Sequence, residues 1–298
     1  MASDPVERPP PAGGRTAGVN PIVAPEYDFP LFADRPRPYV IAESPRSGSQ
    51  LLADLLWRTG RMGSPGEYLN AQYTIPALLQ RFGVGPLEAP GGMEAYLRAL
   101  ARHRTSPNGV FGLKTHFIQL RPHVEDRSVR RLLRRSRFVW LRRRDVLGQA
   151  ISYLVALRSG RWRQLRGAAR RPHHSEFSAR TIDRAIATVA GDDRLWEVAF
   201  DANGVTPLVV WYEDLVADPD PPCRAICAMM GVEPPQPFRL ADSPLERQAD
   251  PVKAEWRARF RDQLGWVRPD PTPASRAEPA APASAPASAP PSPDRPPR

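Results

Sequence analysis

The amino-acid sequence predicts a single α/β domain in which a mostly parallel β-sheet is covered by helices on both faces. Short apolar runs, typical of strands buried on both faces, alternate with segments of helical periodicity. Prolines mark the ends of this domain, because 20 of the 37 lie in residues 1–38 and 269–298. We therefore expect a Pro-rich, largely irregular segment at 1–37, one three-layer domain at 38–268, and a disordered Pro/Ala/Ser tail at 269–298.

The elements of this domain are predicted from the spacing of apolar residues. Residues 39–42 form a short apolar run typical of a buried strand, residues 44–49 are turn-like, and four leucines then recur at helical spacing from residue 51. The chain is therefore expected to begin its fold with a strand, a loop and a helix. The same criteria predict strands at 109–114, 137–141 and 207–212, and helices at about 94–103, 145–159, 180–202, 222–230 and 251–264.

Charge and cysteine content narrow the function classes. The net charge of +10 favours a polyanionic ligand, although genomic base composition also explains an excess of arginine over lysine. Cys223 and Cys227 have no other cysteine to pair with, which excludes a disulfide framework and a Cys-rich zinc site. The sequence has no long apolar run and no secretory signal pattern, so we expect a cytoplasmic protein without a membrane span.

An anion-binding loop is predicted at residues 46–51. A strand that ends in a small-residue turn at a helix start aims backbone N–H groups and the positive end of the helix dipole at one point. Neither lysine follows a glycine, which excludes an ordinary Walker A loop, so Arg46 is expected to supply the fixed positive charge. The alternative is an ordinary turn in which a serine caps the helix.

Further candidate residues lie near the predicted strand ends. Arg144 follows the strand at 137–141 and Ser152 lies about two turns into the next helix, so both are expected to face the ligand crevice of the sheet. Most of the other arginines between 127 and 144 are expected on a solvated surface. Glu67 lies in a Gly/Pro turn, and His116 closes a strand. Taken singly, such residues are more often structural than catalytic.

Several motifs then occur in a consistent order over about residues 38–264. They are PRSGSxLL near the start, TGxxGxPxEY at 59–68, FGxK at 111–114, LRRRDxxxQAxS at 141–152, YEDL at 212–215, and LERQAD followed by EWxxRFR at 255–261. Together they resemble the bacterial trehalose 2-sulfotransferase family of carbohydrate sulfotransferases. The common order makes this resemblance more specific than any one motif.

The resemblance implies transfer of a sulfuryl group from 3′-phosphoadenosine 5′-phosphosulfate (PAPS) to a sugar hydroxyl, without a metal, on a P-loop-like phosphosulfate-binding loop. Trehalose or a glycolipid sugar would be the acceptor, no specific nucleic acid would bind, and a homodimer is left open. Glu67 matches the family's proposed general base. By position, the donor would be held by Arg46, Ser47, Gly48, Ser49 and Gln50 at the 5′-phosphosulfate, by Arg144 and Ser152 at the 3′-phosphate, and by Arg247 and Gln248 over the nucleotide.

Three departures from the family pattern qualify this expectation. Gln50 replaces a small hydroxyl residue, which affects one side-chain contact to the phosphosulfate, and Ser64 replaces an acidic residue, so the acceptor pocket is expected to differ. Lys114, Thr115 and His116 also match a motif of the wider cytosolic sulfotransferases, in which the histidine is the base. We favour Glu67 over His116, and expect that burial raises the pKa of Glu67 or that its carboxylate accepts the proton late.

Two other classes of protein remain open on sequence alone. A P-loop-like nucleotide kinase would share the strand, loop and helix, but it would normally need a lysine in the loop and a Mg²⁺-binding Ser/Thr after it. An Arg-rich nucleic-acid-binding protein would use residues 127–144, where aromatic side chains for base stacking are scarce.

Overall fold

The computed structural model describes residues 21–160, 162–163, 176–245 and 251–264. Its centre is a sheet of four strands in the order β2-β1-β3-β4, all parallel. The strands are β1 (Arg37–Glu43), β2 (Val110–His116), β3 (Arg137–Arg142) and β4 (Leu208–Trp211). The predicted α/β class and all four predicted strands are therefore confirmed. Arg247, Gln248 and the tail at 269–298 lie outside the described residues.

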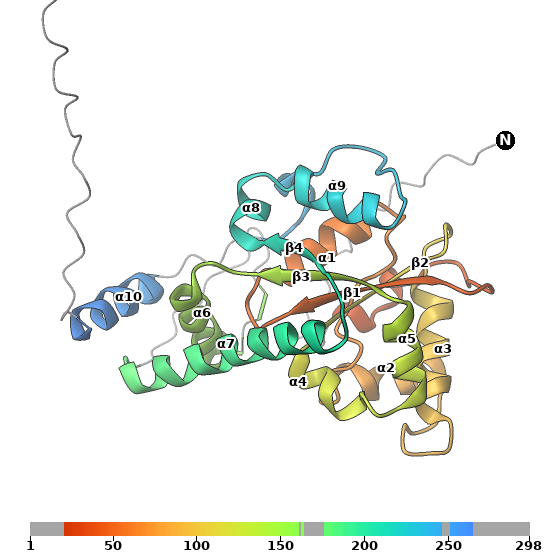
Figure 1. Ribbon diagram of the computed structural model, residues 1–298, viewed down its shortest axis with the longest axis horizontal. Helices are drawn as coiled ribbons and strands as arrows, with labels where there is room; N and C mark the ends of the chain where they lie inside the picture. The colour runs from red at the N-terminus through yellow and green to blue at the C-terminus, as the bar shows by residue number, and fades with distance from the viewer. Residues whose placement is uncertain (1–20, 161, 164–175, 246–250, 265–298) are drawn as a thin grey trace, which may run out of the picture.

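Alternate residues of the strands face two apolar layers, because successive side chains of a strand point to opposite faces. Tyr39 and Ile41 pack on one side with α1 (Ser49–Arg58) and α9 (Asp220–Met229), which contributes the two buried, unpaired cysteines. The side chain of Val40 packs in the other layer. That layer, below the sheet in Figure 1, contains α3 (Gly92–Arg104), α5 (Arg127–Arg135) and α7 (Ala179–Ala202).

A third apolar cluster joins the helices beyond the carboxyl end of β3. Ile151 and Val155 of α6 (Val146–Ser159) pack with Ile182 of α7 and with Trp256 and Phe260 of α10 (Pro251–Gln263). This cluster lies at the left of Figure 1, where α10 adjoins α6. It fixes the position of α6, which carries Ser152.

The shorter helices were not expected from the sequence. They are α2 (Thr74–Phe82), α4 (Phe117–Leu120) and α8 (Tyr212–Ala217). Helices α4 and α8 are too short to show a periodic apolar pattern. The strand predicted at 207–212 accordingly ends one residue early, because Tyr212 begins α8.

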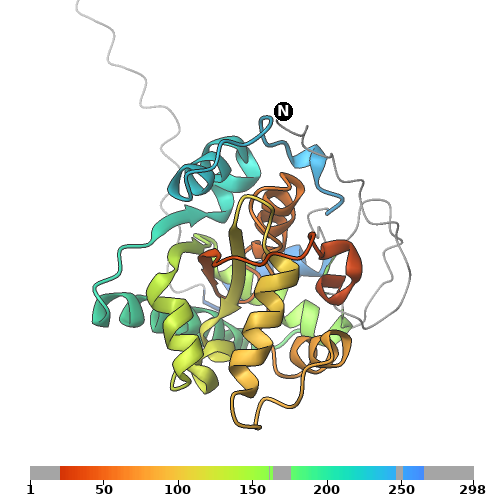
Figure 2. The same cartoon turned by 90° about the vertical axis from the view of Figure 1, so that its right-hand side faces the viewer.

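Part of the N-terminal segment is folded onto the body. Residues 21–27 form two short 3₁₀ turns, η1 (Pro21–Val23) and η2 (Pro25–Tyr27), and Ile22, Tyr27 and Phe29 are buried. The segment, red in Figure 2, then crosses the end of α3, where the amide of Phe29 donates to the carbonyl of His103 at 2.8 Å. No helix among the described residues is both long and apolar enough to cross a bilayer.

Candidate active site

The loop between β1 and α1 has the backbone geometry of a specialised site. Arg46 has a φ of 65°, and it is the non-glycine residue with positive φ among those described. Such a conformation costs a side-chain-bearing residue about 1–2 kcal/mol and therefore points to a function. Gly48 has a φ of 96°, and a Cβ there would lie 2.3 Å from the ring of Tyr212. Both its conformation and this close approach require glycine.

Helix α6 holds this loop from the side. The side-chain amide of Gln149 donates to Ser44 Oγ at 2.9 Å and to the carbonyl of Pro45 at 2.8 Å. One turn further along, Ser152 Oγ accepts from Arg46 Nε at 3.1 Å and from Lys253 Nζ of α10 at 3.4 Å. Ser152 thus lies beside the predicted anion-binding loop, as its position in the sequence led us to expect.

The loop is strongly cationic. Arg143 donates to the carbonyl of Arg46 at 3.4 Å and lies over the ring of Tyr212, 4.7 Å from its centroid. Its Nε is buried and has no hydrogen-bond partner among the described residues. Burial, followed by the charge of Arg143, lowers the pKa of Arg46 to about 10, at which Arg46 still carries its charge near neutral pH. The start of α1 adds the positive end of a helix dipole. This arrangement suits an anion.

Arg144 has a different set of partners. Its guanidinium binds both carboxylate oxygens of Asp214, at 2.6 and 2.9 Å, and lies 4.8 Å from the ring centroid of Trp211. Its side chain is 47% exposed. In this conformation Arg144 is paired at the end of β4, whereas Ser152 is bound to Arg46.

A cluster of charged side chains lies next to the loop, at the ends of β1 and β2. Lys114 is buried, and its ammonium group contacts Glu67 Oε1 at 2.6 Å, Glu43 Oε1 at 3.1 Å and Ser49 Oγ at 3.3 Å. The parallel register pairs Glu43 with His116, whose Nε2 lies 3.9 Å from Glu43 Oε2. Glu67 and His116, the two candidate bases, are therefore brought together.

The protonation state of Glu67 follows from these neighbours. Burial raises its pKa, but the charges of Lys114 and His116 and hydrogen bonds from Lys114 and Gln119 outweigh burial and hold the pKa well below its ordinary value. Of the two routes expected for Glu67, a pKa raised by burial is therefore wrong, and late acceptance of the proton stays a prediction. Burial also opposes the charge on Lys114, but Glu43 and Glu67 outweigh it and raise the pKa of Lys114.

The turn that carries Glu67 is docked on β2. The amide of Lys114 donates to the carbonyl of Gly66 at 3.0 Å, and Gly66 forms a parallel bridge with Leu113. Ser64, expected to alter the acceptor pocket, is buried and its hydroxyl donates to the carbonyl of Tyr27. Its hydroxyl is therefore engaged with the N-terminal segment.

A metal ion fits this cluster poorly. Ligand atoms of Glu43, Glu67 and His116 lie within 4.8 Å of one another, a spacing that would suit a cation. The ammonium group of Lys114, however, contacts both carboxylates. A divalent ion would have to displace this charge from a buried position.

The comparisons with known proteins now identify the family. A family model described as Stf0 sulphotransferase matches residues 38–263, most of the chain. The chain belongs to the Stf0 sulphotransferase family. The resemblance drawn from the sequence motifs is confirmed, and the chain is a sulfotransferase.

Two curated relatives of this Stf0 sulphotransferase are trehalose 2-sulfotransferases. The one from Mycolicibacterium smegmatis is 29% identical over 77% of this chain and 96% of its own length. The one from Mycobacterium tuberculosis is 30% identical over 76% of this chain and 94% of its own length.

Two solved structures are also similar to this chain. The sulfotransferase domain of the Synechococcus PCC 7002 olefin synthase is 20% identical and covers 80% of this chain and 98% of its own, with a TM-score of 0.38. A sulfotransferase from Alicyclobacillus acidocaldarius is 15% identical and covers 78% of this chain and 97% of its own, with a TM-score of 0.42.

Several residues of the Stf0 site were not singled out from the sequence. Glu43 ends an apolar strand and is buried. The signal available in the sequence was an acidic residue directly after the apolar run at 39–42. Gln149 stands inside the motif at 141–152 without an assigned role, and Arg143 was grouped with solvated arginines although it lies against the loop. Lys253 could be found only through the packing of α10 on α6.

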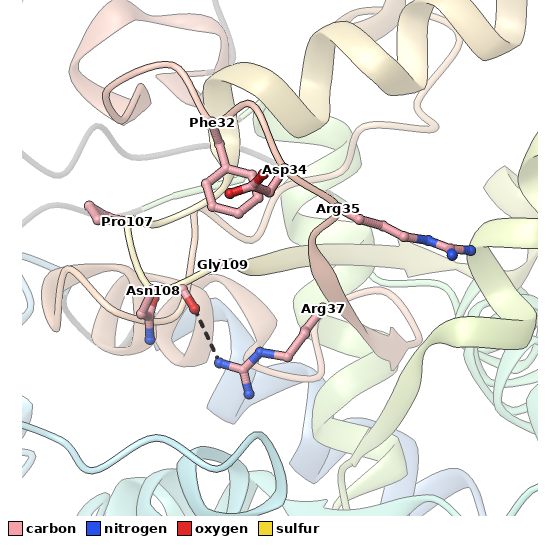
Figure 3. Close-up of a pocket in the computed structure, with 7 residues that line it drawn as sticks. All are labelled: Phe32, Asp34, Arg35, Arg37, Pro107, Asn108 and Gly109. Carbon is pink, nitrogen blue, oxygen red and sulfur yellow. Dashed lines mark hydrogen bonds between the residues drawn. The ribbon is translucent and has the colours of Figure 1, made fainter.

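A separate pocket lies at the opposite end of the strands, where β1 and β2 begin. Figure 3 shows Phe32, Arg35, Arg37 and Asn108 around it, with Arg37 donating to the carbonyl of Asn108 at 3.2 Å. Arg37 begins β1, whereas the anion-binding loop follows the end of the same strand. Ligands of open parallel sheets bind outside the carboxyl ends of the strands, and this pocket lies at the other ends, away from the candidate active site.

Proposed function

We propose that this sulfotransferase transfers a sulfuryl group from PAPS to a hydroxyl of a carbohydrate. One observation carries the proposal. Ser49, the first residue of α1, bonds to Lys114, and Lys114 bonds to Glu67, so the cationic loop and the carboxylate form one continuous site. An anionic donor bound at the loop would present its sulfur to an acceptor held near Glu67.

The donor is assigned to the loop and α6. Arg46 and the backbone N–H groups at the start of α1 would hold the 5′-phosphosulfate, since the first amides of a helix lack partners within the helix. Ser152 and Arg144 would hold the 3′-phosphate. Arg144 would then exchange Asp214 for the phosphate, a small cost because the pair is exposed. Arg247 and Gln248, outside the described residues, would close over the nucleotide.

The proposed reaction is an in-line displacement at sulfur. The acceptor hydroxyl oxygen forms a bond to sulfur while the bond from sulfur to the bridging oxygen breaks, and the electron pair of that bond leaves with 3′-phosphoadenosine 5′-phosphate (PAP). Glu67 takes the hydroxyl proton. Because its carboxylate is ionised and weakly basic, it accepts the proton late, as the oxygen–sulfur bond forms. Arg46 and the loop amides stabilise the charge on the sulfuryl and bridging oxygens.

His116 is the second candidate for the base. Its imidazole lies in the same cluster, near Glu43 Oε2 and the carboxylate of Glu67. We favour Glu67 as the base, because the turn that carries it matches the family motif at 59–68, whereas His116 matches a motif of the wider cytosolic sulfotransferases.

The acceptor class is inferred from the relatives. Both curated relatives are named for trehalose, which makes trehalose the first acceptor to assay, followed by other sugars and glycolipid head groups. The direct experiment incubates the protein with PAPS labelled with ³⁵S and each acceptor, and measures labelled sugar. ATP with Mg²⁺ serves as the control donor, and transfer from ATP rather than PAPS would overturn the proposal.

Nucleotide selectivity provides a prediction that does not depend on turnover. The protein is expected to bind PAP more tightly than AMP, because the 3′-phosphate would accept charge-assisted hydrogen bonds worth roughly 1.5–3 kcal/mol each. Arg144→Ala should remove most of this preference. Isothermal titration calorimetry with both nucleotides measures it. Equal affinity of the unmodified protein for PAP and AMP would contradict the donor assignment.

Arg46 is predicted to act mainly on the chemical step. PAP lacks the sulfuryl group, so Arg46→Ala should lower kcat by about 10²–10³-fold, as loss of an oxyanion donor does, while weakening PAP binding less. Arg46→Lys should restore part of the rate, because it keeps a point charge without the planar fork. Steady-state kinetics and calorimetry separate the two effects. A kcat within about threefold of the unmodified value would refute this role.

A further inference from the structure

The N-terminal segment contacts the turn that carries Glu67. This segment, residues 21–29, precedes the family match, which begins at residue 38. A Cβ on Gly66 would lie 2.4 Å from Ile22 Cγ1, so the side chain of Ile22 fills the space immediately above the residue before Glu67. The hydroxyl of Ser64 donates to the carbonyl of Tyr27. Two points of the turn are therefore fixed by residues outside the family match.

The same turn is also held by β2. Gly66 accepts a hydrogen bond from the amide of Lys114 at 3.0 Å, and the next side chain, Glu67, meets the ammonium group of Lys114 at 2.6 Å. Within the turn, the hydroxyl of Tyr68 donates to the carbonyl of Ser64. The turn thus contacts Lys114 of β2 as well as Ile22 and Tyr27 of the N-terminal segment.

The segment is itself firmly anchored. The ring of Tyr27 lies 4.6 Å from that of Trp57 in α1, and both side chains are buried. Asp28 is paired with Arg81 of α2 and with Arg104 of α3, at 3.4 Å for the second pair. These contacts connect the segment to three helices. The segment is therefore held in a fixed position beside the turn.

We propose that residues 21–29 are a positioning element for Glu67. The proposal rests on the proposed function, in which Glu67 is the base. Ile22 and Tyr27 restrain the turn so that the carboxylate of Glu67 stays against Lys114 and in line with the acceptor. Truncating Ile22 removes its contact with Gly66, and truncating Tyr27 removes the ring that anchors the segment on Trp57, so either change leaves the turn free to shift away from β2. A displacement of about 1 Å of a catalytic group can cost roughly 100-fold in rate.

The test uses point variants in the full chain. Ile22→Ala and Tyr27→Ala should each lower kcat by at least about 10-fold, with PAP affinity within about twofold of the unmodified protein, because the donor loop and α6 are untouched. Ile22→Val and Tyr27→Phe should restore most of the rate, since they keep the packing. Val129→Ala is the matched control, because Val129 is a fully buried member of the same apolar cluster but lies on α5.

Hydrogen exchange gives a second readout that is independent of activity. The amide of Lys114, which donates to Gly66, should exchange at least about 10-fold faster in Ile22→Ala and Tyr27→Ala than in Val129→Ala, because its protection depends on the docked turn. The proposal would be overturned if the Lys114 amide exchanged at the same rate in the segment variants as in Val129→Ala. It would also be overturned if Val129→Ala lowered kcat as much as the segment variants do. If the unmodified protein transfers no sulfate from PAPS, the proposed function fails, and the exchange measurement still decides whether the segment positions the turn.

Discussion

Replacing Glu67 with glutamine is expected to abolish most of the sulfate transfer while PAP binding is retained. Glutamine keeps the shape of the side chain but cannot accept a proton, and general-base catalysis typically contributes 10²–10⁴-fold, so kcat should fall by about that factor. The donor is assigned to the cationic loop and α6 and not to Glu67, so PAP affinity should stay close to that of the unmodified protein. Turnover and calorimetric affinity measured on the same sample test both parts.

The matched comparison is His116→Asn. If Glu67 is the base, this variant should remain active, because the carboxylate stays in place and Lys114 still holds its pKa below the ordinary value. Near-normal turnover of Glu67→Gln beside an inactive His116→Asn would reverse the assignment.

The pH profile of kcat distinguishes the two bases without mutation. The pKa of Glu67 is held well below its ordinary value, so a Glu67 base is ionised at every pH from 8 down to about 5. The rate should therefore stay level over this range. A rate that falls as the pH drops within this range would instead show that the base takes up a proton there, and would contradict the Glu67 assignment.

Replacing Lys114 with methionine is expected to cause the largest loss of stability. It removes the cation that contacts both Glu43 and Glu67, and leaves two carboxylates facing each other in a buried position. Breaking a buried ion pair by deleting one partner typically costs about 3–5 kcal/mol. Denaturant unfolding near pH 7 measures the change. Lys253→Met is the control, since Lys253 is the only other lysine in the sequence and should cost much less.

The loss of folding stability in Lys114→Met is expected to become smaller as the pH falls. In the unmodified protein the lowered pKa of Glu67 stabilises the fold above the unfolded-state value of about 4.3, and this stabilisation is lost as the pH drops through the folded-state pKa. In the variant Lys114 no longer opposes the effect of burial, so the pKa of Glu67 should rise, and protonation of its carboxyl as the pH falls should relieve the repulsion. If the free energies of unfolding of the variant and the unmodified protein differ by the same amount at pH 7 and at pH 5, this explanation is contradicted.

The side of the candidate site to which we assign the donor was largely predictable from the sequence. An apolar run followed by small residues and a helical leucine pattern located β1, the loop and α1, because each depends on local residue order. Ser152 was expected near the loop because it follows β3 by two helical turns, and it is bound to Arg46.

The acceptor side depends on contacts that no local pattern records. Lys114 bridges Glu43 and Glu67 only because β1 pairs with β2 in one register and the turn at 63–68 docks on β2. Sequence reasoning therefore allowed for burial to dominate the pKa of Glu67, whereas Lys114 decides it. The contact of Ser64 with Tyr27 was missed for the same reason, since the two residues are 37 positions apart.

The buried N-terminal segment also affects how recombinant fragments of this protein should be cut. A fragment that starts at residue 38, where the family match begins, would omit Ile22, Tyr27 and Phe29, which are each no more than 7% exposed in the full chain. Their removal would uncover the apolar surface of Trp57 and its neighbours on the outside of the protein. Exposed apolar patches of this kind promote self-association, so expression should begin no later than residue 21.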